Sequence, residues 1–424
     1  MIELNRKEKA LLVTVDVFRQ RTKGISLEDE ANELRELVKT AGLEVTREES
    51  CRLDKPSPNL FVGAGKAWEL CLLVSEHNID AAIFSADLSG TQARNLEEKL
   101  GCKIIDRTQL ILDIFAQHAR SPEAKTQVEL AQLEYFLPRL TGKGVMLSRM
   151  GGGIGARGPG EQKLELDRRT IRNRIGKLKR ELAKERAQRD LLRKKRKEER
   201  IPLVSLVGYT NAGKTTLLNS LVNEHQLADD SLFTTLDPLS RTLILPNHQK
   251  IIISDTVGFL HNLPHHLIEA FKATLEDARQ ADLLIHVLDV SHPLRDSYYE
   301  SVNKVLLELE CQGKNIIIAL NKIDKLEDQS WIERDKQDFP ESIVISALKK
   351  ENLEQLLTAI SQKVSKTMER VELAIPLAKM GLVDMIYREG KVEKASYTGK
   401  AVIIKAVLPI TITRKLSEFL KKEI

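Results

Sequence analysis

Aromatic residues are scarce in this chain of 424 amino acids, at 4% of the sequence. That scarcity argues against a protein that binds single-stranded nucleic acid by stacking bases on aromatic side chains. Only four cysteines occur (Cys51, Cys71, Cys102 and Cys311), and they are scattered without the spacing of a metal site. They indicate reduced thiols rather than a disulfide framework, which is typical of a cytoplasmic protein.

Long apolar runs are also missing. No stretch approaches the roughly 20 apolar residues that a membrane-spanning helix needs, and the first residues, MIELNRKEKALL, lack the apolar core and cleavage site of a signal peptide. Charged residues make up 30% and hydrophobic residues 42% of the chain, as in ordinary soluble proteins. We therefore expect a monomeric cytoplasmic protein with no membrane span and, from its length, about three domains.

Positive charge is concentrated in one segment. Residues 165–200 hold sixteen Lys and Arg against seven Asp and Glu, and this surplus of nine exceeds the net charge of +5 of the whole chain. A run of this kind is often only the solvated face of a helix. Its position beside a glycine- and arginine-containing stretch favours an anionic partner instead, and RNA is the partner that we expect.

The stretch 206–217 reads LVGYTNAGKTTL and fits the template G-x-x-x-x-G-K-[ST] of a phosphate-binding loop. An apolar run precedes it and a helix-like run follows, as this loop requires. Glycines let backbone N–H groups close around phosphates, and the following helix directs its positive end at them. We expect Lys214 to reach the β- and γ-phosphates and the Thr215 hydroxyl to bind Mg²⁺. The expected phosphate contacts are Gly208, Tyr209, Thr210, Asn211, Ala212, Gly213, Lys214 and Thr215.

Two further stretches predict how the chain senses the γ-phosphate. DTVG, residues 255–258, closes an apolar strand, so Asp255 can hold Mg²⁺ through water and the Gly258 N–H can touch the γ-phosphate. FTTLDP, residues 233–238, occupies the first-switch position, where Thr235, and in second place Thr234, binds Mg²⁺ only in the triphosphate state. We expect Lys214, Thr235 and Gly258 to be catalytic. The contacts that these stretches add are Phe233, Thr234, Thr235, Leu236, Asp237, Asp255, Thr256, Val257 and Gly258.

Two more stretches predict the base. NKID, residues 321–324, follows an apolar strand, and the Asp324 carboxylate can accept the N1–H and the exocyclic amine of guanine, a donor pair that adenine lacks. SAL, residues 346–348, follows another strand and offers a backbone contact to the guanine oxygen. The expected base contacts are Asn321, Lys322, Ile323, Asp324, Ser346, Ala347 and Leu348. Because all of these motifs occur in order and each follows a strand, the chain is predicted to be a GTPase that binds GTP and GDP.

The fold class predicted is α/β. Alternating strand and helix patterns indicate an N-terminal α/β domain over residues 1–120, a helical hairpin over 121–200, a P-loop GTPase domain with a doubly wound sheet over 201–365 and a small C-terminal α/β domain over 366–424. NLFVGAGK, residues 59–66, resembles a second phosphate loop. It lacks the full spacing and a following Ser or Thr, which favours a structural turn over a second nucleotide site.

The predicted hairpin carries a glycine-rich loop, TGKGVMLSRMGGGIGARGPGE, at residues 141–161. A flexible linker is one interpretation of its eight glycines. The interspersed Arg, Met and Ile favour a functional loop whose bare backbone approaches RNA closely. The helix from residue 161 has a heptad-like apolar stripe, which predicts an antiparallel coiled coil with a helix over 123–137. The expected RNA contacts are Gly151, Gly152, Gly153, Arg157, Arg193, Lys194, Lys195, Arg196 and Lys197.

These motifs together resemble the HflX family of ribosome-associated GTPases. GYTNAGKTT, FTTLDP, DTVGF, NKID and SAL carry the resemblance, and GGGIGARGPGE before the basic helix is its most specific mark. It covers residues 1 to about 365, and the tail is a looser match. The resemblance implies a cytoplasmic GTPase that binds the large ribosomal subunit, inserts the loop towards the peptidyl-transferase centre and splits stalled ribosomes in its GTP form.

One residue departs from Ras-like switches, which place a water-orienting glutamine directly after the DxxG glycine. Phe259 stands there instead and cannot polarise water. We therefore expect slow intrinsic hydrolysis that ribosomes stimulate. Three alternatives to ribosome splitting stay open from the sequence: a ribosome-assembly GTPase, an antibiotic-resistance factor that acts on the ribosome, and an RNA-binding module that uses GTP only for structural order.

Overall fold

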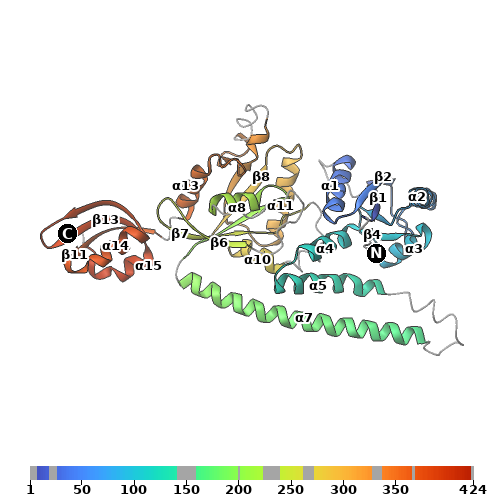
Figure 1. Ribbon diagram of the computed structural model, residues 1–424, viewed down its shortest axis with the longest axis horizontal. Helices are drawn as coiled ribbons and strands as arrows, with labels where there is room; N and C mark the ends of the chain where they lie inside the picture. The colour runs from blue at the N-terminus through green and yellow to red at the C-terminus, as the bar shows by residue number, and fades with distance from the viewer. Residues whose placement is uncertain are drawn as a thin grey trace, which may run out of the picture. The chain divides into compact units, whose positions relative to one another are not determined.

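The computed structural model describes residues 7–18, 26–140, 159–198, 201–222, 239–260, 272–326, 337–364 and 368–421. In these residues the strands form three sheets, of four, six and three strands (Figure 1). Backbone contacts divide the chain into two units, and the division falls between Arg186 and Ala187, inside the long helix α7 (Pro159–Glu198). The α/β class predicted from the sequence is confirmed.

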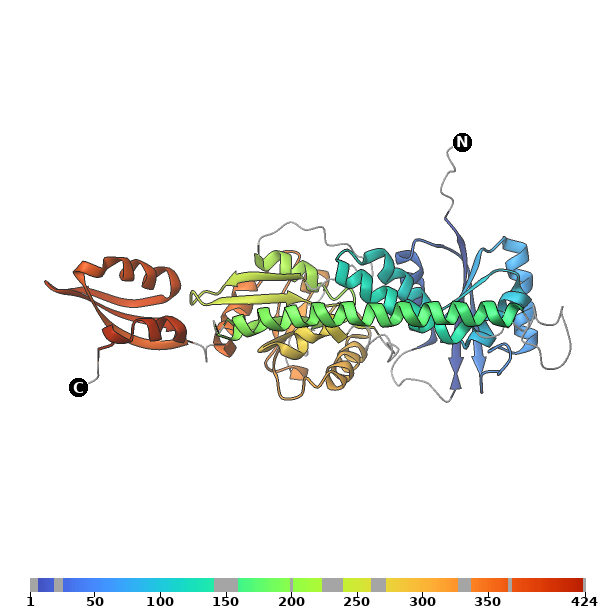
Figure 2. The ribbon, with the colours of Figure 1, turned by 90° about the horizontal axis from the view of Figure 1, so that it is seen from below.

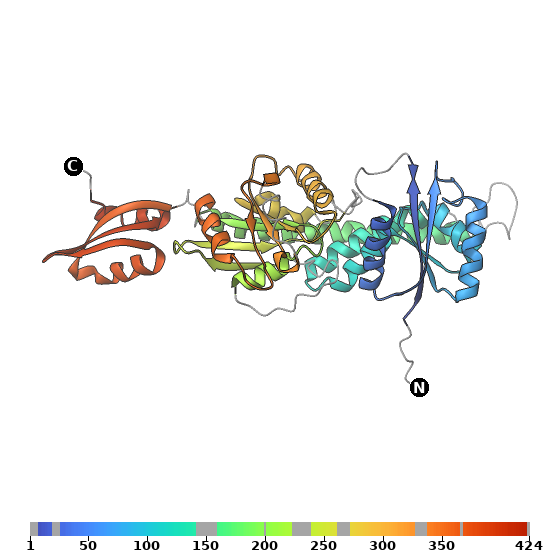
Figure 3. The ribbon, with the colours of Figure 1, turned by 90° about the horizontal axis from the view of Figure 1, so that it is seen from above.

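The first sheet is parallel, with the strand order β2-β1-β3-β4. Its strands are β1 (Lys9–Val17), β2 (Glu44–Leu53), β3 (Ala81–Phe84) and β4 (Lys103–Asp106). Its helices are α1 (Leu27–Thr40), α2 (Ala64–His77), α3 (Gly90–Leu100) and α4 (Arg107–His118). Helix α1 contacts α4 and α2 contacts α3, so that one pair covers each face of the sheet (Figure 3).

Local signals explain part of this domain. Ser26 caps α1 as its sequence predicts, and Asp29 completes a reciprocal capping box. Strand β2 was not predicted, because its sequence EVTREESCRL is charged and mostly exposed at the sheet edge. Only Cys51 of this strand is fully buried. Such an edge strand gives little hydrophobic periodicity to detect.

A helical hairpin follows the first sheet. Helix α5 (Pro122–Phe136) continues into a 3₁₀ turn, η2 (Leu137–Leu140), and then α7 lies beside α5 and runs in the opposite direction (Figures 1 and 2). Two ion pairs join the helices, Arg174 with Glu129 (2.6 Å) and Lys179 with Glu134 (2.8 Å). The antiparallel helix pair predicted from the sequence is therefore observed. No helix in the described residues is long and apolar enough to cross a membrane.

The second sheet has the order β10-β9-β8-β5-β7-β6 and is parallel except for β6 at its edge. Its strands are β5 (Leu203–Gly208), β6 (Leu239–Ile244), β7 (Lys250–Asp255), β8 (Leu283–Asp289), β9 (Asn315–Asn321) and β10 (Ile343–Val344). Its helices are α8 (Lys214–Val222), α10 (Lys272–Gln280), α11 (Arg295–Glu308) and α13 (Leu353–Val364). The β6–β7 hairpin at the edge matches the prediction. The central strands β5 and β8 are mostly apolar, as expected for strands buried on both faces, although β5 contains Ser205 and β8 contains His286.

The third sheet is antiparallel, with the order β11-β13-β12, and α14 and α15 pack on it. Its elements are β11 (Met368–Pro376), α14 (Met380–Glu389), β12 (Lys391–Tyr397), β13 (Ala401–Pro409) and α15 (Ile410–Lys415). The final helix predicted near residues 413–422 is not continuous: α15 ends at Lys415, and a 3₁₀ turn, η6 (Ser417–Phe419), follows it. The chain then returns to β11, where Leu420 forms a bridge with Leu373 and the Lys421 N–H donates to the Glu372 carbonyl.

Candidate nucleotide-binding site

Four of the predicted loops leave the same edge of the second sheet. The phosphate loop follows β5, DTVG ends β7, NKID ends β9 and SAL follows β10. Because the strands are parallel, their carboxyl ends lie at one edge, which is where open α/β sheets bind ligands. Hydrogen bonds between these loops, described below, bring the separate motifs into a single site.

Lys214, the first residue of α8, is held inside the phosphate loop. Its Nζ donates to the carbonyl oxygens of Gly208 (3.1 Å) and Tyr209 (2.8 Å), and the residue is only 6% exposed. Burial lowers the pKa of Lys214 to about 8, against the opposing charge of Asp255 and with a further lowering by Lys322. Phosphate oxygens would offer this ammonium charged acceptors in place of the neutral carbonyls.

Thr215 and Asp255 form an oxygen pair at the start of α8. The Thr215 hydroxyl donates to Asp255 Oδ2 over 2.7 Å, although the two residues lie 40 positions apart. A hydroxyl and a carboxylate are oxygen donors, which Mg²⁺ prefers, and nucleotide phosphates and water would have to complete an octahedral shell. These two oxygen ligands therefore fit Mg²⁺: Thr215 would bind the ion directly, and Asp255 would hold it through water.

The chain after DTVG turns back onto the phosphate loop. The Thr210 N–H donates to the Phe259 carbonyl (2.8 Å), and the Phe259 N–H donates to the Gly208 carbonyl (3.1 Å). A Cβ at Gly258 would lie 2.8 Å from the Cα of Thr210, so only glycine fits this approach. The Phe259 side chain is 1% exposed and is packed in the interior, where it has no access to a substrate water.

Asn321 joins three motifs in the base-binding region. Its amide Nδ2 donates to the Ala212 carbonyl of the phosphate loop (2.8 Å), and its Oδ1 accepts the Ala347 N–H of SAL (2.9 Å). The contact is so close that a side chain at Gly213, whose φ is +93°, would collide with the amide. Asn321 therefore links the phosphate loop to the SAL loop by hydrogen bonds, a role that its place in NKID alone does not reveal.

Asp324 and Lys322 are oriented by residues from other loops. The Ser346 hydroxyl donates to Asp324 Oδ1 over 2.6 Å, which directs the carboxylate expected to read guanine. Lys322 Nζ lies 2.7 Å from Asp289 Oδ2 at the end of β8. Leu348, the last predicted base contact, is 72% exposed. Asp289 was missed at the sequence level, because a lone aspartate after a strand has no motif around it.

An aromatic stack also joins the phosphate loop to α11. The rings of Tyr209 and Tyr298 are parallel within 6°, with centroids 3.7 Å apart. The Tyr298 hydroxyl lies 3.4 Å from His292 Nε2, so a third ring adjoins the stack. Tyr298 and His292 were not predicted, since two aromatic residues distant in sequence from a loop give no spacing signal.

His286 lies in the middle of β8 and is 1% exposed. Neither of its ring nitrogens has a hydrogen-bond partner among the described residues, and the ring stacks on Tyr299 at 5.1 Å. Burial, with a smaller effect of the Lys214 charge, lowers the pKa of His286 to about 3. The histidine is therefore neutral at physiological pH and leaves Lys214 as the positive charge of the phosphate loop.

Some predicted residues lie outside the described part of the chain. They are the first-switch residues Phe233, Thr234, Thr235, Leu236 and Asp237, and the loop residues Gly151, Gly152, Gly153 and Arg157. Arg193, Lys195, Arg196 and Lys197 lie on α7, but only Lys194 of this basic run has a described side chain, which is exposed. The second Mg²⁺ ligand and the RNA contacts therefore stay predictions.

The second loop-like stretch, residues 59–66, leads into α2. Its lysine, Lys66, is engaged by two carboxylates, Glu49 (2.8 Å) and Glu69 (3.0 Å). Lys214, in contrast, donates to the neutral carbonyls of Gly208 and Tyr209, which phosphate oxygens could replace. This arrangement favours the structural turn that the spacing predicts.

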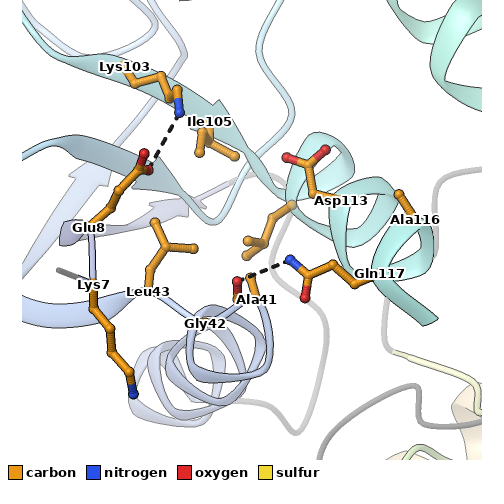
Figure 4. Close-up of a pocket in the computed structure, with 11 residues that line it drawn as sticks. Lys7, Glu8, Ala41, Gly42, Leu43, Lys103, Ile105, Asp113, Ala116 and Gln117 are labelled. Carbon is orange, nitrogen blue, oxygen red and sulfur yellow. Dashed lines mark hydrogen bonds and ion pairs between the residues drawn. The ribbon is translucent and has the colours of Figure 1, made fainter. Parts of the chain in front are cut away.

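A cavity of about 490 Å³ lies in the same domain at the amino ends of the strands (Figure 4). Its charged lining residues are Lys7, Glu8, Lys103 and Asp113. Lys103 Nζ lies 3.5 Å from Glu8 Oε2, and Gln117 Nε2 donates to the Ala41 carbonyl over 3.2 Å (Figure 4). Ligands of open parallel sheets bind at the carboxyl ends, so this cavity lends no support to a second nucleotide site.

Three family models match the chain. They describe the N-terminal region of a GTP-binding GTPase (residues 28–116), the middle region of a GTP-binding GTPase (118–196) and a 50S ribosome-binding GTPase (203–322). Together with the loops gathered at one edge of a doubly wound sheet, they define the class: the chain is a P-loop GTPase, an enzyme that hydrolyses GTP.

The family follows from full-length relatives. The chain is 46% identical to GTPase HflX of Caldanaerobacter subterraneus subsp. tengcongensis over 99% of this chain and 96% of that protein. It is 40% identical to GTPase HflX of Escherichia coli K12, over 92% of each. The chain therefore belongs to the HflX GTPase family. It is also 28% identical to a GTP-binding protein of Sulfolobus solfataricus solved with GDP (TM-score 0.44, 85% of this chain and 99% of that one).

Proposed function

We propose that this GTPase binds the large ribosomal subunit in its GTP form and splits stalled ribosomes. The observation that carries the proposal is the basic helix α7, which extends over 40 residues and is joined in one chain to a GTP site. Exposed cations on it include Arg169, Arg172, Lys184 and Lys194. A stripe of exposed cations of this length suits the phosphate backbone of RNA. The match to a 50S ribosome-binding GTPase model supports the same partner.

The nucleotide step assigns a role to each described loop. Lys214 would release the carbonyls of Gly208 and Tyr209 and bind the β- and γ-phosphates. Mg²⁺, held by Thr215 with Asp255 behind it, would neutralise charge on the phosphates. Asn321 keeps the phosphate loop fixed to the base loops, and Asp324, directed by Ser346, would select guanine.

The switch follows from the contact between Gly258–Phe259 and the phosphate loop. In the described conformation the Phe259 backbone pairs with Gly208 and Thr210, directly beside Lys214. A γ-phosphate at Lys214 would compete for this space and would draw the Gly258 N–H towards itself. The two nucleotide states would thus differ in the position of the segment after β7, and ribosome affinity would differ with them.

Sedimentation of ribosomes with this protein and a non-hydrolysable GTP analogue tests the proposal. Separation of the joined subunits supports it. Binding to the large subunit without separation would favour the ribosome-assembly alternative. Binding that is indifferent to nucleotide would favour an RNA-binding module, and displacement of a peptidyl-transferase antibiotic without separation would favour a resistance factor.

A further inference from the structure

One arginine holds the last described residues before the glycine-rich segment against the N-terminal sheet. Arg139 lies in η2, and its Nη2 donates to the Leu88 carbonyl (2.5 Å) and to Asp106 Oδ2 (2.9 Å). Its Nη1 donates to the Tyr135 carbonyl (3.2 Å), and its guanidinium carbon lies 3.5 Å from the centre of the Tyr135 ring. Such a combination of a hydrogen-bonding fork and a stacked face is specific to arginine.

Asp106, the partner of this arginine, is itself buried and firmly held. It is the last residue of β4, is 3% exposed, and accepts the N–H groups of Leu88 (3.1 Å) and Gln109 (2.9 Å). Burial raises the pKa of Asp106, while these bonds, a bond from the Tyr135 hydroxyl and the Arg139 charge oppose the rise. A carboxylate so placed depends on a neighbouring cation, because an uncompensated buried charge is costly.

The backbone of η2 also lies directly on the start of α3. A Cβ at Gly90, the first residue of α3, would lie 2.9 Å from the Cα of Arg139 and 3.0 Å from its Cγ. A larger residue at Gly90 must therefore displace the η2 backbone. The turn η2 is therefore held in two ways: by the charge of Asp106 at the end of β4, and by the close fit of Gly90 at the start of α3.

We propose that Arg139 is a positioning residue, which clamps the end of α5 to Asp106 and Leu88 and so fixes where the chain leaves the N-terminal sheet towards the glycine-rich segment 141–161. The inference rests on the proposed function, in which that segment acts on the ribosome. On the α7 side of the hairpin, the ion pairs of Glu129 and Glu134 hold the second helix to α5. The N-terminal sheet domain thus fixes the position of η2, the last described turn before the glycine-rich segment.

Two substitutions disturb the clamp by different physics. Arg139→Met removes the charge and the fork, whereas Gly90→Ala keeps every charge and pushes η2 away from α3. Arg107→Met is the control, because Arg107 forms an ion pair with Glu33 in the same domain, and their side chains are 11% and 13% exposed, against 22% and 2% for Arg139 and Asp106. Arg139→Lys, which keeps the charge beside Asp106 but loses the fork, serves if the Met variant does not fold.

Hydrogen exchange and ribosome splitting are measured on the full-length variants. We expect the Leu137 amide, which donates to the Leu133 carbonyl, to exchange at least tenfold faster in Arg139→Met and Gly90→Ala and at the normal rate in Arg107→Met. Splitting should fall at least tenfold in the first two variants, with basal GTP turnover within twofold of normal. The control should keep its splitting rate even where its melting temperature falls as far as that of Arg139→Met.

Three outcomes decide against parts of this scheme. Normal exchange at Leu137 in both clamp variants overturns the clamp itself. Faster exchange with undiminished splitting shows that the clamp holds the turn but does not position the loop. If the unaltered chain splits no ribosomes, the proposed function fails, and the exchange rates alone then decide whether Arg139 fixes the turn.

Discussion

Asp324 and Ser346 come from loops after different strands, and the Ser346 hydroxyl donates to Asp324 Oδ1 over 2.6 Å. Two motifs that are short and weak on their own are thus joined by a hydrogen bond. The serine orients the carboxylate, and we expect the carboxylate to supply the charge that matches the N1–H and amine of guanine.

Asp324→Asn should therefore weaken GTP binding by about 10- to 100-fold, since a hydrogen bond to a charged group contributes about 1.5–3 kcal/mol. The same variant should gain affinity for xanthosine triphosphate, whose base offers an acceptor where guanine has a donor. Ser346→Ala is the control, because it keeps the carboxylate and should weaken GTP binding without changing the preferred base. Competition binding with both nucleotides checks this, and an Asp324→Asn variant that still prefers GTP would refute it.

The lowered pKa of Lys214 predicts that the protein takes up a proton when it binds GTP. Its pKa in the nucleotide-free protein is lowered to about 8, mainly by burial, whereas bound phosphates stabilise the charged form. Near and above pH 8 the binding of GTP should therefore include proton uptake, and affinity should fall as the pH rises through this range. Calorimetric titration at about pH 8.5, just above this pKa, in two buffers with different ionisation enthalpies measures the uptake. Lys214→Arg, which stays charged, should abolish it, and equal heats in both buffers for the unaltered protein would contradict the prediction.

His286 predicts a loss of stability in acid. Its folded pKa of about 3 lies below the ordinary value of 6.5, so the unfolded chain binds a proton that the folded chain does not. Stability from this residue is complete above about pH 6.5 and is lost progressively as the pH falls towards 3. His286→Leu should remove this dependence and should melt higher relative to the unaltered protein at about pH 5.5 than at about pH 7.5, on either side of the unfolded pKa. Scanning calorimetry at the two pH values decides, and an equal difference at both would show that His286 does not contribute.

How much of this site the sequence predicts depends on how tightly chemistry restricts each residue. A phosphate loop needs glycine, lysine and a hydroxyl at set spacings, so Gly213, Lys214 and Thr215 can be recognised from the sequence alone. The stack of Tyr209 on Tyr298 and the ion pair of Lys322 with Asp289 have no such spacing, because tertiary packing alone brings them together. The same reason hides Arg139, whose partners belong to other elements of the sheet domain.

The fold prediction failed where pairing with a distant strand, rather than the local sequence pattern, decides the secondary structure. Strand β2 is charged and lies at an edge, so pairing with β1 rather than its own periodicity forms it. After α15 the chain makes only the 3₁₀ turn η6 and then pairs with β11 through Leu420 and Lys421. The long apolar strands of the GTPase sheet were predicted, because burial on both faces leaves a continuous apolar run in the sequence.

Phe259 predicts slow intrinsic hydrolysis that the large ribosomal subunit accelerates severalfold or more. Its buried side chain cannot orient a water, and its backbone pairs with Gly208 and Thr210. Phe259→Leu, which keeps an apolar side chain in the interior, should leave nucleotide affinity within a few-fold of normal. Single-turnover hydrolysis with and without large subunits measures both effects. Fast turnover by the isolated protein, unchanged by ribosomes, would show that another group already positions the water.

The last prediction separates the two regions of the chain that are expected to meet RNA. Deletion of Gly151 to Gly160 should leave GTP binding and the melting of the GTPase domain near normal, because these residues precede residues 201–365, which form that domain. The same deletion should abolish subunit splitting, since the deleted glycine-rich backbone is the part that we expect to enter a narrow RNA-lined site.

Neutral replacement of Arg193, Lys194, Lys195, Arg196 and Lys197 should act differently. Ribosome binding should weaken and its salt dependence should flatten, with the slope of log K against log salt reduced by up to about four, since each lost phosphate contact removes about 0.7–0.9. Sedimentation at several salt concentrations measures this slope, and light scattering follows splitting. If the deletion variant splits ribosomes as well as the intact chain does, the glycine-rich segment is only a linker, and splitting must be assigned to α7 and the GTPase domain alone.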